Sequence, residues 1–121
     1  MTEHDEQKRY MAWLKDNHPE VDGVTTSTAN GAYMGHNAKA ARQMAKLKAA
    51  GLKTGFPDVI MLYPCGDFHG LAIEMKALDG GVISTEQLEW RDRLLAQGFA
   101  HAFCNGADAA ITATKTYLST C

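Results

Sequence analysis

The chain has 121 residues, of which 45% are hydrophobic and 21% are charged, and its formal net charge is −2. This length suits one domain, residues 1–121, with enough apolar content for a core, and the charge excludes a globally basic nucleic-acid binder while leaving room for a local basic patch. No run approaches the roughly 18 consecutive apolar residues of a membrane helix, and the polar start MTEHDEQKRY does not resemble a signal peptide, so we expect no membrane association.

The first half of the chain predicts two helices around a short strand. Residues 3–16 carry apolar side chains at helical spacing and end at the stretch HPE. The stretch VDGVTTSTANG, residues 21–31, indicates a short strand and a turn. Residues 38–50 are rich in Ala, Lys and Met and predict a second helix.

The second half of the chain predicts three strands and two helices. A hairpin is expected between DVIMLY and LAIEMK, and Ser84 is expected to cap a helix because Gln87 lies three residues on, at capping-box spacing. The predicted elements are strands at 58–63, 71–76 and 99–104 and helices at 84–97 and 107–119. The order α–β–α–β–β–α–β–α is typical of an α/β sheet flanked by helices.

The stretch LAIEMK places two opposite charges, Glu74 and Lys76, inside an apolar run. Residues two apart in a strand point to the same face, so these two side chains stand side by side. The opposite face is apolar and carries Leu71, Ile73 and Met75. One face of this strand is therefore expected to join the core and the other to carry a charged pair.

The predicted hairpin brings Asp58, at the start of one strand, near Glu74 and Lys76, at the end of the other. Two converging carboxylates repel one another unless something neutralises them, and a hard cation such as Mg²⁺ with oxygen ligands does so. The lysine is then placed to polarise a water on the ion or to balance developing phosphate charge. An exposed ion pair on an edge strand is the alternative, and spacing alone leaves it open.

An extended pattern of residues surrounds these three. Pro57-Asp58 is separated by fifteen residues from Glu74-Met75-Lys76. The other residues of the pattern, from the N-terminal side to the C-terminal side, are Gly55, Gly70, Ser84, Gln87, Trp90, Leu95 and Gly98. This pattern resembles the VRR-NUC (virus-type replication-repair nuclease) domain of the PD-(D/E)XK nuclease superfamily, over essentially the whole chain. The resemblance implies a restriction-endonuclease-like α/β fold with a mixed central sheet flanked by helices, and a metal-dependent DNA endonuclease.

The resemblance also implies roles for individual residues. Asp58, Glu74 and the backbone carbonyl of Met75 would bind Mg²⁺ or Mn²⁺, and Lys76 would be the catalytic lysine. Gln87 would lie beside that lysine, although a capping role alone also accounts for it.

The family uses one more acidic residue, from the first helix, and the chain offers Glu3 and Glu6. Glu3 shares a helix face with Gln7, Tyr10 and Leu14, so it is preferred for the catalytic and metal-binding role. The alternative for either acid is a stabilising position at a helix N-terminus.

Several residues are candidates for contacts to DNA. Lys39, Arg42 and Lys46 lie at i, i+3 and i+7 of the second helix, with Lys53 just beyond, and such a row can neutralise backbone phosphates. A solvated helix face explains the row equally well. Asn30 resembles part of the family's loop near the site, with a type I′ turn as the alternative.

Cysteine, histidine and tryptophan patterns give weaker indications. Three widely spaced cysteines give no support to a disulfide framework and fit a reducing cytoplasm, where we expect this protein to act. The five histidines show no ligand spacing for zinc. Trp13 and Trp90 lie at helical core spacing and are expected to pack rather than to stack on bases.

The resemblance suggests a structure-selective nuclease of DNA repair, recombination or replication. A unit of this size resembles archaeal-type Holliday junction resolvases, which are homodimers, and two sites related by a two-fold axis suit paired cuts in branched DNA. A nickase or flap nuclease is the first alternative. A non-catalytic DNA-binding module is the second, and intact Asp58, Glu74 and Lys76 argue against it.

Overall fold

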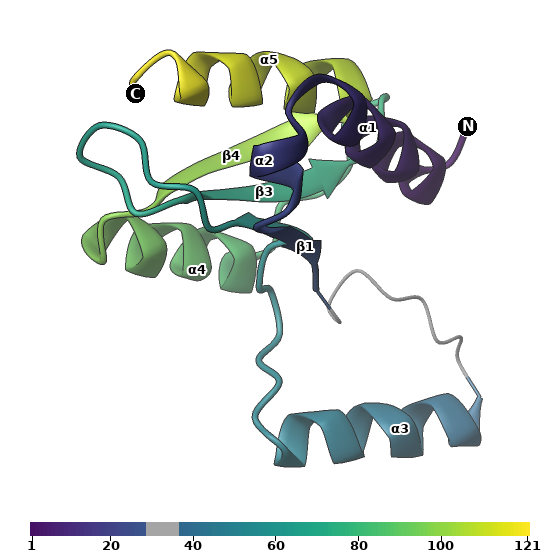
Figure 1. Ribbon diagram of the computed structural model, residues 1–121. Helices are drawn as coiled ribbons and strands as arrows, with labels where there is room; N and C mark the ends of the chain where they lie inside the picture. Colours follow the sequence, from purple (N-terminus) through teal and green to yellow (C-terminus); the bar gives the residue numbers. More distant parts are fainter. Residues whose placement is uncertain (29–36) are drawn as a thin grey trace.

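In the computed structural model, which describes residues 1–28 and 37–121, a four-stranded sheet lies between helices (Figure 1). The strands are β1 (Thr25–Ser27), β2 (Val59–Met61), β3 (Leu71–Lys76) and β4 (Ala100–Asn105), in the spatial order β1-β2-β3-β4. The pairs β1–β2 and β2–β3 are antiparallel and β3–β4 is parallel. The predicted mixed sheet flanked by helices is therefore confirmed.

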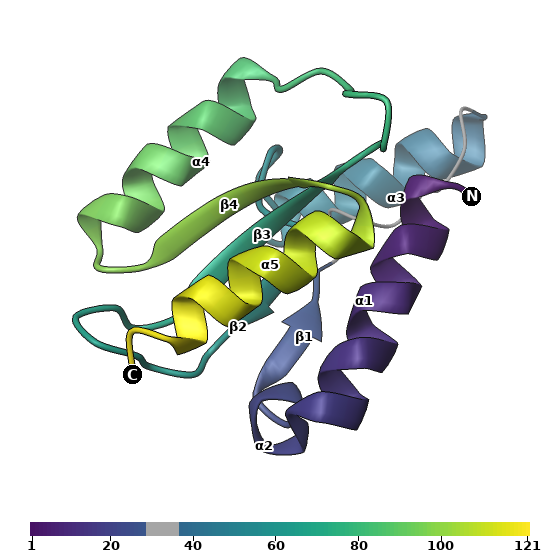
Figure 2. The same ribbon diagram turned by 90° about the horizontal axis from the view of Figure 1, so that it is seen from above.

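The helices are α1 (Glu3–Asn17), α2 (Pro19–Asp22), α3 (Ala38–Ala49), α4 (Thr85–Ala96) and α5 (Gly106–Leu118). Helices α1 and α5 pack on one another over one face of the sheet, and α4 lies on the opposite face (Figures 1 and 2). Helix α3 stands apart from the sheet on the side of α4 (Figure 1). The parallel β3–β4 pair has α4 as its crossover, the connection that parallel strands require.

The observed elements differ from the predicted ones in two places. The single helical turn α2 was missed because four residues show no periodicity, although Pro19 stands at its first position, where proline is favoured. The strand expected at 58–63 is shortened to Val59–Met61 and lies between Pro57 and Pro64, which have no N–H for a sheet ladder.

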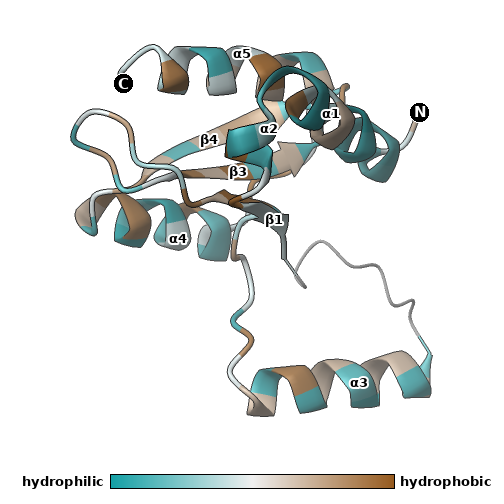
Figure 3. Ribbon diagram, viewed as in Figure 1, coloured by the Kyte–Doolittle hydropathy of each residue, from teal (hydrophilic) through white to brown (hydrophobic). Residues whose placement is uncertain are grey.

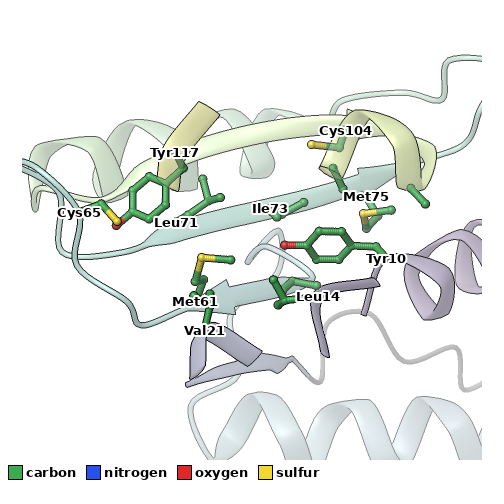
Figure 4. Close-up of a cluster of buried hydrophobic side chains, with 13 residues drawn as sticks. Tyr10, Leu14, Val21, Met61, Cys65, Leu71, Ile73, Met75, Cys104 and Tyr117 are labelled. Atoms are coloured by element: carbon green, nitrogen blue, oxygen red, sulfur yellow. The ribbon is translucent and has the colours of Figure 1, made fainter. Parts of the chain in front are cut away.

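The main core lies between the sheet and the pair α1–α5 (Figure 4). Tyr10 and Leu14 of α1 and Ile73 of β3 are fully buried there. The Tyr10 hydroxyl is 2.6 Å from the Thr114 hydroxyl of α5, so the buried polar atoms satisfy one another. Colouring by hydropathy shows apolar residues along the strands and polar ones over much of α1 (Figure 3). Burial of apolar side chains thus fixes α1 and α5 on this face.

The cysteines depart from the expectation drawn from their spacing. Cys65, in the loop after β2, is joined by a disulfide to Cys121, 56 positions further along the chain, with their Cα atoms 4.3 Å apart. Helix α5 runs back along the sheet, so the C-terminus reaches this loop (Figure 2). Spacing along the sequence carried no information about that approach. Cys104 is a buried free thiol.

Among the residues that the structure describes, no helix has both the length and the apolar character to span a bilayer.

Candidate active site

The β2–β3 hairpin brings two carboxylates together. Val59 is opposite Ile73 in the antiparallel ladder, so Asp58, one residue earlier, lies beside Glu74. The Met75 backbone N–H donates a 2.7 Å hydrogen bond to Asp58 Oδ2, which orients that carboxylate toward β3. The hairpin register therefore creates the acidic pair that the sequence predicts.

The charged face of β3 is buried. Asp58 is 8% exposed, Glu74 5% and Lys76 8%. Strand β3 lies between β2 and β4 and is not an edge strand. The alternative of an exposed ion pair on an edge strand is therefore wrong.

Gln87, from the first turn of α4, links the acid to the lysine. Its Nε2 donates to Glu74 Oε1, and its Oε1 accepts a 2.7 Å hydrogen bond from Lys76 Nζ. Lys76 Nζ also donates to the Val82 carbonyl at 2.6 Å. The capping box is present as well, since Ser84 Oγ accepts from the Gln87 backbone N–H. The capping role and the role beside the lysine are thus both filled by this one residue.

The surroundings of the acidic pair disfavour the ionised form of Glu74. Burial raises the pKa of Glu74 well above its usual range, the neighbouring Asp58 carboxylate raises it further, and Lys76 opposes the shift. Glu74 Oε2 is buried and has no hydrogen-bond partner among the residues that the structure describes. A buried hydrogen-bond acceptor of this kind costs free energy unless a cation or a hydrogen-bond donor binds it.

The two acidic candidates of α1 have different surroundings. Partial burial raises the pKa of Glu3, Asp58 raises it further and Lys76 lowers it, so Glu3 lies within electrostatic range of the site. Glu6 instead accepts a 3.0 Å hydrogen bond from the Ala107 backbone N–H at the start of α5, which lowers the pKa of Glu6. Of the two acids, Glu3 is thus the one in electrostatic range of Asp58 and Lys76, and Glu6 anchors α5 to α1.

Within residues 1–28 and 37–121, no three or more His, Cys, Asp or Glu side chains cluster closely enough to hold a metal ion. Two carboxylates, those of Asp58 and Glu74, lie together at the site, and Met75, between Glu74 and Lys76 in β3, donates its backbone N–H to Asp58. Hard oxygen donors of this kind suit Mg²⁺ or Mn²⁺ better than zinc.

A cavity of about 320 Å³ opens onto the acidic pair. Asp58, Glu74 and Gln87 line one side, and Met44 and Lys48 of α3 line another. Lys48 was not among the site residues predicted from the sequence. Its position four residues after Met44, on the same helix face, is the signal that could have found it.

The other cations of this region lie on the surface. Lys39, Arg42 and Lys46 are exposed on α3, and Lys53 is exposed in the segment that follows. None of these four lines the cavity at the acidic pair. Asn30 falls outside the described residues.

The segment between α3 and β2 docks on α4. Gly55 has φ +88°, and a Cβ there would lie 2.7 Å from Glu86 Cβ, so glycine allows the close approach. Phe56 then meets Trp90 edge-to-face, with ring centroids 4.9 Å apart. Trp13 packs against the main core as expected, whereas Trp90 packs against Phe56 outside it.

Comparisons with known proteins place this site in a family. The family model described as the VRR-NUC domain matches residues 1–108. A solved structure described as "VRR_NUC domain protein" has a TM-score of 0.83 and 24% sequence identity, and the match covers 99% of this chain and 90% of that one. It shows the same fold. No curated protein matches the chain. Because the family model covers most of the sequence, this chain belongs to the VRR-NUC family of nucleases.

Proposed function

We propose that this protein is a metal-dependent DNA endonuclease that hydrolyses phosphodiester bonds at Asp58, Glu74 and Lys76. The observation that carries the proposal is the buried carboxylate pair, in which Glu74 Oε2 has no partner. Purely structural packing rarely leaves a buried acid in this state, and groups with strongly perturbed pKa values that face a cavity are candidates for function.

The donor set fits a divalent cation. Asp58, Glu74 and the Met75 carbonyl would hold Mg²⁺ or Mn²⁺, with Glu3 as a further acid from α1. When bound, the ion supplies Lewis-acid polarisation and neutralises charge on the phosphate.

Lys76 is positioned to stabilise negative charge on a phosphate. An ammonium has three N–H donors, and the Val82 carbonyl and Gln87 Oε1 engage two of them. The third donor is left to stabilise a phosphate oxygen or to orient the attacking water. Because Gln87 contacts both Lys76 and Glu74, it fixes their relative positions.

The exposed row on α3 would hold the DNA backbone. Lys39, Arg42, Lys46 and Lys53 would neutralise phosphates that flank the cut, without reading base sequence. Neutralising the first three together is then expected to make the salt dependence of DNA affinity shallower by a slope of about 3, because each phosphate that no longer meets a cation accounts for roughly 0.9. An unchanged slope would return this row to a solvated helix face.

The substrate we propose is branched DNA, such as a four-way junction, cut by a homodimer. Two copies related by a two-fold axis would carry two Asp58–Glu74–Lys76 sites at a fixed separation and would make paired nicks on opposite strands. Sedimentation at micromolar concentration tests the dimer, and mapping of the cuts on a junction tests the pairing. A monomer that makes single nicks would leave a nickase or flap nuclease instead.

The activity is tested with labelled four-way junction, flap, splayed arm, duplex and single strand, each incubated with Mg²⁺, Mn²⁺ or EDTA. Cleavage should require a divalent ion, favour the branched substrates and disappear in Glu74→Gln. The matched control is Glu20→Gln, because Glu20 is an exposed glutamate of α2 that lines neither this cavity nor the neighbouring one. Cleavage that persists in EDTA contradicts metal dependence. Binding without cleavage under every condition would identify a non-catalytic DNA-binding module.

A further inference from the structure

A second cavity lies beside the first and has different walls. Its volume is about 250 Å³, and it is lined by Thr28, Gly51, Leu52, Lys53, Phe56 and Trp90. Leu52 and Phe56 also line the cavity at the acidic pair, so the two cavities share a wall. Phe56 lies two residues before Asp58. A group that enters the second cavity therefore lies beside the cavity that opens onto the acidic pair.

The walls of this second cavity are mostly apolar and aromatic. Phe56 and Trp90 are half-buried, and their rings meet at an interplanar angle of 89°, so ring surface of both remains at the cavity. The Arg93 guanidinium lies 5.4 Å from the Trp90 ring centroid, and Lys53 lines the cavity. An aromatic cavity with a cation, Lys53, in its wall suits a flat π-system that carries an attached anion.

The cavity has the size of one small ring system. Pockets that enclose whole drug-sized ligands have volumes of roughly 300–1,000 Å³, and about 250 Å³ is smaller. A single nucleobase is flat, has a π-face and is joined to a phosphate through its sugar. That combination fits this cavity, with the base at the aromatic rings and the phosphate next to Asp58.

The same helix turn positions both cavities. Gln87 and Trp90 are three residues apart on α4 and therefore share a helix face. The backbone of Gly55 is docked against Glu86 and Gln87, which fixes Phe56 relative to the same turn. The distance between the aromatic rings and the acidic pair is thus set by rigid contacts.

We propose that this second cavity binds an unpaired nucleobase of the strand being cut, next to the scissile phosphate. The proposal rests on the nuclease function proposed above and specifies its substrate. In a regular duplex each base is held in the stack by its partner, and its unpairing costs free energy. An unpaired base at a branch, bulge or flap enters without that cost, so the cavity selects DNA with an unpaired base at the cut.

Trp90 itself reports occupation of the cavity. The chain has two tryptophans, so Trp90 is the only one left in a Trp13→Phe variant. This variant is titrated, in EDTA, with three duplexes that are identical except at one position: a bulged thymine, a bulged abasic site, or no bulge. We expect the bulged thymine alone to quench Trp90 fluorescence and to bind about 5- to 150-fold more tightly than the abasic bulge, the range for stacking of one base on an aromatic side chain. Equal affinities and unchanged emission would overturn the proposal.

Variants at Trp90 separate stacking from packing. Trp90→Phe keeps an aromatic face and should keep the preference for thymine over the abasic site. Trp90→Leu keeps apolar volume and should lose that preference, while its affinity for the abasic duplex stays the same. Since the comparison of thymine with the abasic site needs no Trp90 variant, a Trp90→Leu protein that fails to fold leaves the test intact.

Cleavage of the two bulged duplexes in Mg²⁺ and Mn²⁺ distinguishes this proposal from the nuclease function. Cutting without any preference for thymine would refute the base-binding cavity and leave the nuclease function standing. Quenching by the bulged thymine with no cutting in either metal would support the cavity and refute the nuclease function.

Discussion

The two faces of β3 are both buried, but one is apolar and the other carries charged side chains. On one face Leu71, Ile73 and Met75 pack against α1 and α5, and on the other Glu74 and Lys76 are only 5% and 8% exposed. The first face stabilises the fold through apolar burial. The second removes two charged groups from water and leaves one carboxylate oxygen without a partner. Burial alone therefore does not distinguish a core from a site, and the unsatisfied polar atom does.

Loss of the lysine should have the largest effect on the polar face. We expect Lys76→Ala to lower the rate of metal-dependent DNA cleavage by about 10²–10³-fold or more, as loss of a group that stabilises developing charge does. The matched control is Lys8→Ala, since Lys8 is an exposed lysine of α1. Cleavage assays on the preferred substrate measure the rate, and a normal rate in Lys76→Ala would show that the assignment of this lysine is wrong.

Truncation on the apolar face should change stability instead. Ile73 is fully buried, and Ile73→Ala should lower the free energy of unfolding by about 2–5 kcal/mol, because it removes buried apolar surface and leaves a cavity. Urea denaturation measures the loss. The rate of cleavage by the fraction that remains folded should stay within a few-fold of normal, because the site lies on the opposite face of β3. Abolished cleavage in fully folded Ile73→Ala would show that the two faces are not separable.

The fold and the acidic site were predictable to different degrees. The alternation in LAIEMK and the capping box at Ser84 were sufficient to predict β3 and α4, because both patterns report local geometry. The pairing of Asp58 with Glu74 followed from the hairpin. Burial of Lys76 could not be predicted, because it depends on the Val82 carbonyl and on Gln87, which reach it only after α4 docks.

Contacts between distant segments were the least predictable. The anchoring of α5 by Glu6 joins residues 101 positions apart, and the local pattern of α1, which favoured Glu3 by its helix face, does not reveal this distant partner of Glu6. The place of Lys48 in the wall of the cavity likewise depends on how α3 lies relative to the sheet.

Protonation of a histidine in β4 should lower the stability of the protein at acidic pH. His101 of β4 is paired in register with Ala72, and burial, together with the nearby Arg91, lowers the pKa of His101 to about 4. The folded state thus favours the neutral ring, and its contribution to stability is lost as pH falls from about 6.5, the unfolded value, through about 4. We expect a loss of about 1–3 kcal/mol across this range. Urea denaturation of the wild type and of His101→Gln isolates this loss from that of the carboxylates, and parallel pH profiles would contradict it.

The smallest expected effect on stability comes from removing a charge of the acidic pair without changing its shape. Glu74→Gln replaces a carboxyl group whose ionisation is opposed by burial and by Asp58, and whose Oε2 has no partner among the described residues, by a neutral amide of the same shape. The free energy of unfolding should therefore stay the same or rise by about 1 kcal/mol, whereas cleavage is lost. Urea denaturation at pH 7 without metal measures the change, and added Mg²⁺ should stabilise the wild type more than the variant, because only the wild type keeps both acids. A clear loss of stability in Glu74→Gln would show that the carboxylate holds the fold together, and the contrast between the two faces of β3 would then fail.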